Sequence, residues 1–261
     1  MWKHWTVPNF LNFRHWKIET RVDSGSAMEH PSTVLYLEHD GKVLLVDANG
    51  SGPQRPEMNR IGNTQFRFPT SKEAKAMGLV WSEKNQFRFL GTTVIKAHPE
   101  IEWPKDWAWK DECISDDAVH PIAREAIYRS IHRVVTKVMV LNDAGEVLMG
   151  KVERGHFVGH WTLPGGYMDH DEHPAIGCVR ETFEEMGIEI ELSDDAPVVT
   201  QRIFTADGIS FVSFTYRANW SGSDSQITPK KNEIADFAWF KPEQALSQAV
   251  SGFDVEALRH L

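Results

Sequence analysis

Three glutamates lie within five residues of one another in the second half of this chain. Glu181, Glu184 and Glu185 are three and four positions apart, so a helix would carry them on one surface. Like charges this close repel, and a cation or a basic partner must offset the repulsion unless solvent screens it. Mg²⁺ prefers hard oxygen ligands and also keeps water and substrate phosphates. The cluster therefore indicates a divalent-cation site that handles phosphate groups, and the alternative is a solvated acidic helix face.

The residues around the cluster predict the helix that carries it. Pro174 suits a first helical turn, where its missing N–H costs nothing, and Gly187 suits the left-handed position just past the end. Apolar residues at spacings of three and four are expected to form one stripe that packs on a sheet. This expected stripe consists of Ile176, Val179, Phe183 and Met186. Cys178 is expected to lie outside both the stripe and the acidic sector.

Residues 165–188 read GGYMDHDEHPAIGCVRETFEEMGI and resemble the Nudix box. Its pattern is G-x5-E-x7-R-E-U-x-E-E-x-G-U, where U is a bulky apolar residue. The matching positions are Gly166, Glu172, Arg180, Glu181, Glu184, Glu185, Gly187 and Ile188. Thr182 departs from the pattern, although it still presents a methyl group. Two flanking stretches also resemble the family, namely WTLP at 161–164 and NEIADFAWFKPEQAL at 232–246.

The resemblance implies a fold and a set of roles. The fold class is α/β, with a C-terminal α/β/α sandwich around a mixed sheet and a smaller β-rich α+β domain before it. The implied cofactor is Mg²⁺ or Mn²⁺. Glu184 and Glu185 are the implied main metal ligands, and Glu181 is a ligand or the general base. Arg180 orients a glutamate, and Glu172 supports the metal site.

The resemblance also implies residues outside the helix. Gly165 and Gly166 are expected to contact the substrate, with a backbone carbonyl near Gly165 completing the metal site, and Trp161 is placed with them. Glu233 stands where some members carry an extra acidic ligand or base, and the alternative is a surface glutamate. The nearby histidines are interpreted first as solvated loop residues rather than ligands. These histidines are His156, His160, His170 and His173.

The implied activity is hydrolysis of a phosphoanhydride bond by direct attack of water on phosphorus. The substrate is a nucleoside diphosphate linked to another moiety. A second domain before the Nudix region resembles the architecture of NADH pyrophosphatases. However, only Cys113 lies where those enzymes often carry a four-cysteine zinc ribbon, and residues 198–214 lack their SQPWPFPxS stretch.

Two other functions stay open. A non-catalytic nucleotide-sensing regulator shares the fold, but such proteins commonly lose box carboxylates, and this box is complete. An enzyme like isopentenyl diphosphate isomerase also shares the fold, but it needs a catalytic cysteine and generally lacks an intact box. Cys178 is the cysteine within the expected helix.

The composition of the chain limits its possible partners and cellular location. The 261 residues carry a formal net charge of −9, which argues against a stable nucleic-acid partner. Two cysteines favour a reducing, cytoplasmic location, and no apolar run is long enough for a membrane helix. Residues 1–17 lack the continuous apolar stretch of a signal peptide. Similar two-domain proteins are dimers, so a homodimer is expected.

Three segments are predicted along the chain. Residues 1–120 form a β-rich domain that serves the substrate pocket or dimerisation, 121–131 a linking helix, and 132–261 the Nudix domain. The first segment should contain a hairpin over 33–47, short strands at 65–68 and 86–90, and a helix over 71–77. The last segment should open with a hairpin of strands at 134–140 and 146–152.

Overall fold

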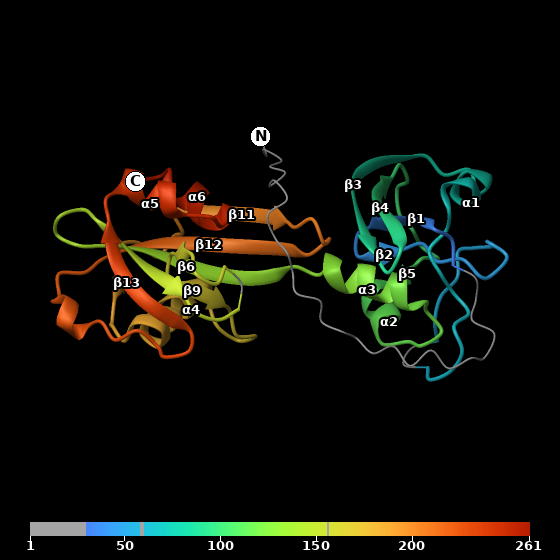
Figure 1. Ribbon diagram of the computed structural model, residues 1–261. Coiled ribbons are helices and arrows are strands. Elements are labelled where there is room, and N and C mark those ends of the chain that lie inside the picture. Colours follow the sequence, from blue (N-terminus) through green and yellow to red (C-terminus); the bar gives the residue numbers. More distant parts are fainter. Residues whose placement is uncertain (1–29, 58–59, 156) are drawn as a thin grey trace. The chain divides into compact units, whose positions relative to one another are not determined.

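The computed structural model describes residues 30–57, 60–155 and 157–261 (Figure 1). Contacts divide the chain into two compact units. The C-terminal unit contains His132–Phe204 and Ser210–Leu261, and the N-terminal unit contains the described residues up to Ile131 together with Thr205–Ile209. The expectation of no signal peptide concerns residues 1–17, which lie outside the described residues.

The N-terminal unit is built on a mixed five-stranded sheet in the order β3-β4-β1-β2-β5. β1 and β4 run parallel, and the other neighbours are antiparallel. The strands are β1 (Thr33–His39), β2 (Lys42–Val43), β3 (Trp81–Phe89), β4 (Thr92–Pro99) and β5 (Ala108–Trp109). The predicted hairpin is confirmed, and its turn residues Asp40 and Gly41 have φ of 47° and 78°. Positive φ at both positions is what a two-residue hairpin turn requires.

The second strand of that hairpin is shorter than predicted. Beyond Val43 the chain makes only isolated bridges, from Leu45 to Gln54 and from Val46 to Arg67. The expected strand at 65–68 is likewise reduced to single bridges. These segments still bury apolar side chains, so they pack into the core without forming a continuous strand ladder.

Three helices complete this unit: α1 (Ser71–Ala76), α2 (Lys110–Ile114) and α3 (Pro121–Ser130). α1 confirms the helix predicted over 71–77, and it begins with a capping box between Thr70 and Glu73. α3 buries Ile122 and Ile127 against strand residues such as Tyr36. It therefore contributes to the core of the N-terminal unit.

The C-terminal unit contains an eight-stranded sheet, and this sheet is mixed, as predicted. Its main order is β10-β12-β6-β7-β13, with β11 on β12, β8 on β7 and β9 on β6. β12 and β6 run parallel, and the other pairs are antiparallel. The strands are β6 (Arg133–Leu141), β7 (Val147–Val152), β8 (Trp161–Thr162), β9 (Gly165–Tyr167), β10 (Glu191–Leu192), β11 (Val199–Phe204), β12 (Ser210–Asn219) and β13 (Ile234–Phe240).

Helices cover both faces of this sheet, which makes an α/β/α sandwich (Figure 1). They are α4 (Pro174–Met186), α5 (Pro242–Gln248) and α6 (Gly252–Leu258), with a short 3₁₀ turn η1 (Asp224–Gln226). Val138 and Val140 of β6 belong to the apolar cluster that includes residues of α4. Met139, between them, belongs to the cluster that includes residues of α5 and α6. Successive strand residues thus supply the two cores.

The buried face of α4 differs from the predicted stripe. Ile176 and Phe183 are 64% and 53% exposed, so their assignment to the buried stripe was wrong. Met186 is buried as expected, and Cys178 and Thr182 are buried in place of the other two, which also corrects the placement of Cys178 outside the stripe. The Thr182 hydroxyl donates a 2.8 Å hydrogen bond to the carbonyl of Cys178. Its polar group is therefore satisfied, and Thr at this position of the box can face the core.

Over the described residues, no helix combines the length and apolar character required to cross a membrane.

Candidate active site

α4 is bounded by the residues that the sequence indicated. Pro174 occupies the first turn, and the ring nitrogen of His173 before it accepts from the Ala175 N–H at 3.3 Å. Gly187 ends the helix with φ of 70°, and its N–H donates to the Phe183 carbonyl. His173 is therefore a helix cap rather than a free loop residue.

Arg180 binds the glutamates on the acidic surface of α4. Its Nη2 and Nε lie 2.6 and 3.1 Å from the two carboxylate oxygens of Glu172, and its Nη1 lies 2.8 Å from Glu181 and 3.1 Å from Glu184. Nη2 also donates to the Tyr167 carbonyl. A planar guanidinium suits such forked binding. Arg180 thus ties the helix to the loop before it, and it lowers the pKa of Glu172.

Glu172 connects the two ends of that loop. Besides Arg180, its Oε1 accepts a 2.7 Å hydrogen bond from the Asp169 N–H. A Cβ at Gly177 would lie 2.7 Å from the same oxygen, so the helix approaches Glu172 closely. These contacts place Glu172 as a support for Arg180.

The two glycines of β9 bring backbone against the carboxylates. The Gly165 N–H donates a 2.9 Å hydrogen bond to Oε2 of Glu185. Gly165 has φ of 139°, and a Cβ there would lie 2.1 Å from the Thr136 carbonyl oxygen. A Cβ at Gly166 would lie 2.7 Å from the carboxylate of Glu181. No larger residue fits here without displacing β6 or a catalytic candidate.

Burial changes the acidity of two of these carboxyls. The pKa of Glu185 is raised to about 7, chiefly by burial; the Gly165 N–H and Lys137 lower it, and the charges of Glu181 and Glu233 add to the rise. Burial also raises the pKa of Glu181, against the effect of Arg180. The ionised forms are costly in this setting, and a bound cation would offset that cost.

Glu233 is the residue immediately before β13, and its charge acts on the carboxylates of α4. Lys230 lies 2.8 Å from Glu233 and 3.7 Å from Glu184, and Arg154 lies 3.8 Å from Glu233. Since the charge of Glu233 raises the pKa of Glu185, its carboxylate is electrostatically coupled to the helix carboxylates. Lys230 was not singled out from the sequence, because nothing in a polar KK pair distinguishes one lysine from another.

The donor set fits a hard divalent cation in its chemistry. Four carboxylates from α4 and the segment before β13 provide oxygen ligands. In the parts of the chain that the structure describes, no three His, Cys, Asp or Glu side chains converge to hold a metal ion as they stand. Arg180 and Lys230 engage the carboxylates instead.

Trp161 and the histidines lie apart from these contacts. The Trp161 ring meets Phe240 edge to face at 5.1 Å and joins the core beneath α5 and α6. His160 is exposed, and His170 is exposed beside Asp171. His156 lies outside the described residues.

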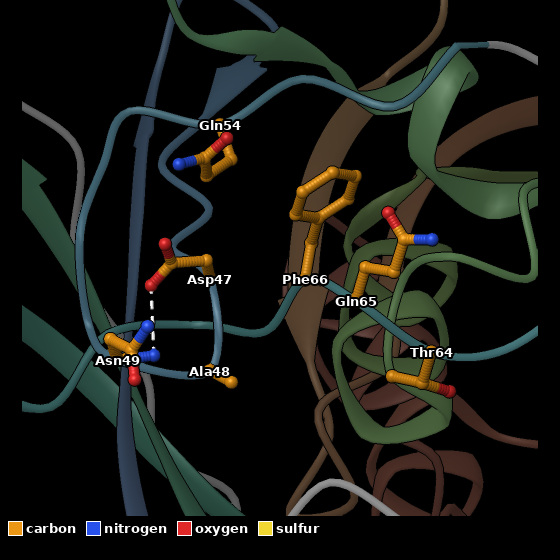
Figure 2. A pocket seen from close by; sticks show the side chains of 7 residues that line it. All are labelled: Asp47, Ala48, Asn49, Gln54, Thr64, Gln65 and Phe66. Carbon is orange, nitrogen blue, oxygen red and sulfur yellow. Dashed lines mark hydrogen bonds between the residues drawn. The ribbon is translucent and has the colours of Figure 1, made fainter.

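A hollow of about 530 Å³ in the N-terminal unit has a different character (Figure 2). Its lining residues are Asp47, Ala48, Asn49, Gln54, Thr64, Gln65 and Phe66. Oδ1 of Asp47 accepts from the backbone N–H groups of Asn49 and Ser51, and the lining includes no basic side chain. This hollow therefore does not offer charge complementary to phosphate.

The family model for the NUDIX domain matches residues 131–261, half of the chain. The chain belongs to the Nudix family and is a Nudix hydrolase. It is 27% identical over 135 residues to a MutT-like protein of Streptomyces ambofaciens, covering 52% of this chain and 80% of that protein. It is 31% identical over 121 residues to the nucleoside triphosphatase NudI of Salmonella heidelberg, covering 43% of this chain and 84% of the relative.

Two further proteins are similar to part of the chain. An RNA pyrophosphohydrolase of Roseobacter denitrificans is 36% identical over 70 residues, which cover 27% of this chain and 43% of that protein. The crystal structure of a MutT Nudix hydrolase from Burkholderia pseudomallei is 26% identical, with a TM-score of 0.43, and covers 49% of this chain and 97% of that one. The family membership supports hydrolysis of pyrophosphate bonds as the general activity.

Proposed function

We propose that this protein hydrolyses the phosphoanhydride bond of a nucleoside diphosphate linked to another moiety, with Mg²⁺ or Mn²⁺ as cofactor. The observation that carries the proposal is the set of carboxylates that Arg180 gathers beside the Gly165–Gly166 backbone. A surface acidic helix would not need an arginine bound to three glutamates, half-buried carboxylates and two glycines packed against them.

Each residue has a role in the proposal. Glu184, Glu185 and Glu233 would hold the cation, and Glu181 would be the general base or a further ligand. When bound, the cation would neutralise phosphoryl charge and activate water for attack. Arg180 and Glu172 keep the carboxylates in place, and the Gly165 N–H orients Glu185. Gly166 leaves room for Glu181.

The proposed reaction is a direct displacement. Water attacks one phosphorus, a new P–O bond forms, and the bond from that phosphorus to the bridging oxygen breaks. A carboxylate accepts the proton that the water loses, and the released phosphate takes the bond electrons. Glu181 is the proposed base because burial raises its pKa, which increases its affinity for a proton. Glu181 as a ligand with Glu233 as base is the alternative assignment.

The two competing functions have less support. The complete box favours catalysis over nucleotide sensing without turnover. An isomerase would need an accessible thiolate, but Cys178 is buried in the core, where burial raises its pKa to about 12. A buried neutral thiol is a poor nucleophile or acid–base group at neutral pH.

The N-terminal unit is proposed to shape the substrate pocket or to mediate a homodimer. Light scattering of the full chain at micromolar concentration tests the second role. A dimer mass is expected, and a monomer mass would refute the dimer.

A substrate panel tests the activity. Nucleotide sugars, dinucleotides, dinucleoside polyphosphates and nucleoside triphosphates are incubated with the protein and Mg²⁺ or Mn²⁺, and products are separated by chromatography. We expect metal-dependent cleavage of a nucleoside diphosphate derivative, abolished by chelator. The matched control is Glu189→Gln, an exposed glutamate just past α4. Cleavage that persists without divalent metal, or no cleavage of any compound, would count against the proposal.

A further inference from the structure

A buried ion pair lies behind the glycine loop and belongs to none of the box positions. The Lys137 ammonium of β6 lies 2.8 Å from Oδ1 of Asp254 on α6. Asp254 is fully buried, and the Lys137 side chain is nearly so. Burying two charges is costly, and an apolar pair of similar volume is often as stable or more so. A purely structural need is therefore a weak reason for this pair.

Both members of the pair also bind the same backbone residue. Nζ of Lys137 donates a 2.9 Å hydrogen bond to the Leu163 carbonyl, and Oδ2 of Asp254 accepts from the Leu163 N–H at 3.3 Å. Leu163 is buried, so these groups have no access to water. The two charges thus hold the peptide groups on both sides of Leu163.

The backbone that is held at Leu163 leads directly into the active site. Two residues further on, the Gly165 N–H donates to Glu185. Lys137 is the register partner of Gly165 in the β6–β9 pair, and a Cβ at Gly165 would lie 2.7 Å from the Lys137 Cα. The backbone at Gly165 is therefore fixed on one side by β6 and on the other by the held Leu163.

We propose that Lys137 and Asp254 are positioning residues, which hold Leu163 and thereby set the Gly165 N–H against Glu185. The inference rests on the proposed function, because it assigns a purpose to the orientation of Glu185. Lys137 also acts through its charge, which lowers the pKa of Glu185. Burial raises the pKa of Asp254, while Lys137 and the Leu163 N–H oppose that rise.

The prediction is a loss of Mn²⁺ affinity and of kcat in full-length Lys137→Met. Supporting groups behind metal ligands typically change metal affinity or activity about 10–100-fold, and we expect losses in that range. Asp254→Asn should lose less, because Lys137 still donates to the Leu163 carbonyl. Lys137→Arg keeps the charge and a donor, so it should recover part of the loss. Arg259→Met, at the residue just past α6, removes a charge paired at the surface with Glu256; it is the control and should change neither quantity.

A double variant separates positioning from stability. Lys137→Met/Asp254→Leu removes both charges, so its unfolding midpoint should return toward that of the wild type. Its Mn²⁺ affinity and kcat should stay low, because nothing then holds Leu163. In ¹⁵N-labelled protein, the Gly165 amide resonance should move in Lys137→Met and in the double variant but not in Arg259→Met.

The outcomes are distinguishable. If the wild type binds no Mn²⁺ by electron paramagnetic resonance, the proposed function fails and the inference fails with it. If the wild type binds Mn²⁺ and Lys137→Met binds it equally well, the inference alone is overturned. If single variants do not fold, recovery of both stability and full Mn²⁺ affinity in the double variant would equally overturn it.

Discussion

Gly166 lies so close to Glu181 that a Cβ at position 166 would come within 2.7 Å of the Glu181 carboxylate. At Gly165 the nearest atom to such a Cβ is the Thr136 carbonyl oxygen, at 2.1 Å. The two adjacent glycines are therefore required for different reasons. One accommodates a movable side chain, and the other accommodates fixed backbone.

Gly166→Ala should leave the protein folded but displace Glu181. The clash is with the end of a flexible side chain, so the unfolding midpoint should change little. We expect kcat to fall about 10-fold or more, which corresponds to roughly 1.4 kcal/mol of lost transition-state stabilisation. Gly165→Ala is the matched comparison, and backbone strain and overpacking should destabilise it by about 2 kcal/mol or more. Thermal unfolding and steady-state kinetics on both variants test this, and an active Gly166→Ala enzyme would contradict it.

Glu185→Gln should separate catalysis from folding. Gln keeps the size and can still accept from the Gly165 N–H, and it removes the cost of burying a charge. The variant should be at least as stable as the wild type at pH 8. Loss of several kcal/mol of cation assistance predicts a fall in kcat of about 100-fold or more, with weaker Mn²⁺ binding. Glu189→Gln serves as the control, and near wild-type turnover by folded Glu185→Gln would remove the metal-site assignment.

The local signals around α4 were sufficient to place its ends. Pro174 and Gly187 act through their own backbone preferences, which do not depend on distant residues. The face that α4 buries was not predictable in the same way. Apolar spacing alone favoured Phe183 and Ile176, whereas the structure buries Thr182, whose hydroxyl bonds within the helix.

Long-range partners were also beyond the sequence. Lys137 sits in a strand of mainly apolar residues, and Asp254 lies in the last helix, so only the folded sheet brings them together. Lys230 meets Glu184 for a similar reason, since the segment before β13 folds back on α4. The spacing of the box identifies carboxylates on one helix. It does not predict which basic side chains from other strands or loops contact those carboxylates.

An ion pair in the N-terminal unit, between buried Arg67 and half-buried Glu73, predicts how stability depends on pH. Glu73 accepts two hydrogen bonds from Arg67, at 2.7 and 2.9 Å, and Arg67 holds the pKa of Glu73 down at about 2, below its ordinary 4.5. A depressed acid pKa stabilises the folded form above pH 4.5, and this stabilisation is lost as pH falls toward 2. The shift alone corresponds to about 3 kcal/mol, and because the Glu73 carboxylate is partly reached by solvent, screening reduces the expected effect to about 1–2 kcal/mol.

The test compares Glu73→Gln with the wild type from pH 2 to 7. Gln can keep the capping contact with Thr70, so the variant removes chiefly the charge paired with Arg67. Chemical denaturation should show a difference of about 1–2 kcal/mol at pH 6 that shrinks toward zero near pH 2. Glu57→Gln, at an exposed partner of Arg60, should show almost none at any pH. A difference independent of pH would mean that the charge is not the cause.

A fragment of residues 132–261 should retain the cation site. Arg180, the helix carboxylates, Glu233 and the Lys137–Asp254 pair all lie in the C-terminal unit. We expect the fragment to fold and to bind Mn²⁺ with an affinity close to that of the full chain, while losing substrate affinity or specificity. Mn²⁺ titration and kinetics with the best substrate of the panel measure the two effects. Mn²⁺ binding by a fragment of residues 1–131, with none by the folded C-terminal fragment, would reverse this division of labour.

Labelled water tests the route of the reaction. Phosphoryl transfer depends mainly on positioning and charge stabilisation, so no covalent intermediate on the enzyme is required. Both cysteines are buried, and burial raises the pKa of Cys113 and of Cys178 to about 12, which makes a thiolate nucleophile unfavourable.

In ¹⁸O water, a single turnover with enzyme in excess should therefore place one ¹⁸O atom in one phosphate product. Mass spectrometry of the separated products shows which phosphorus was attacked. Label on a carbon-bound hydroxyl would indicate cleavage of a C–O bond instead. A first turnover that yields unlabelled phosphates would indicate an oxygen nucleophile on the enzyme. Either result is incompatible with direct attack, because direct attack transfers the water oxygen to phosphorus in the same step that breaks the anhydride.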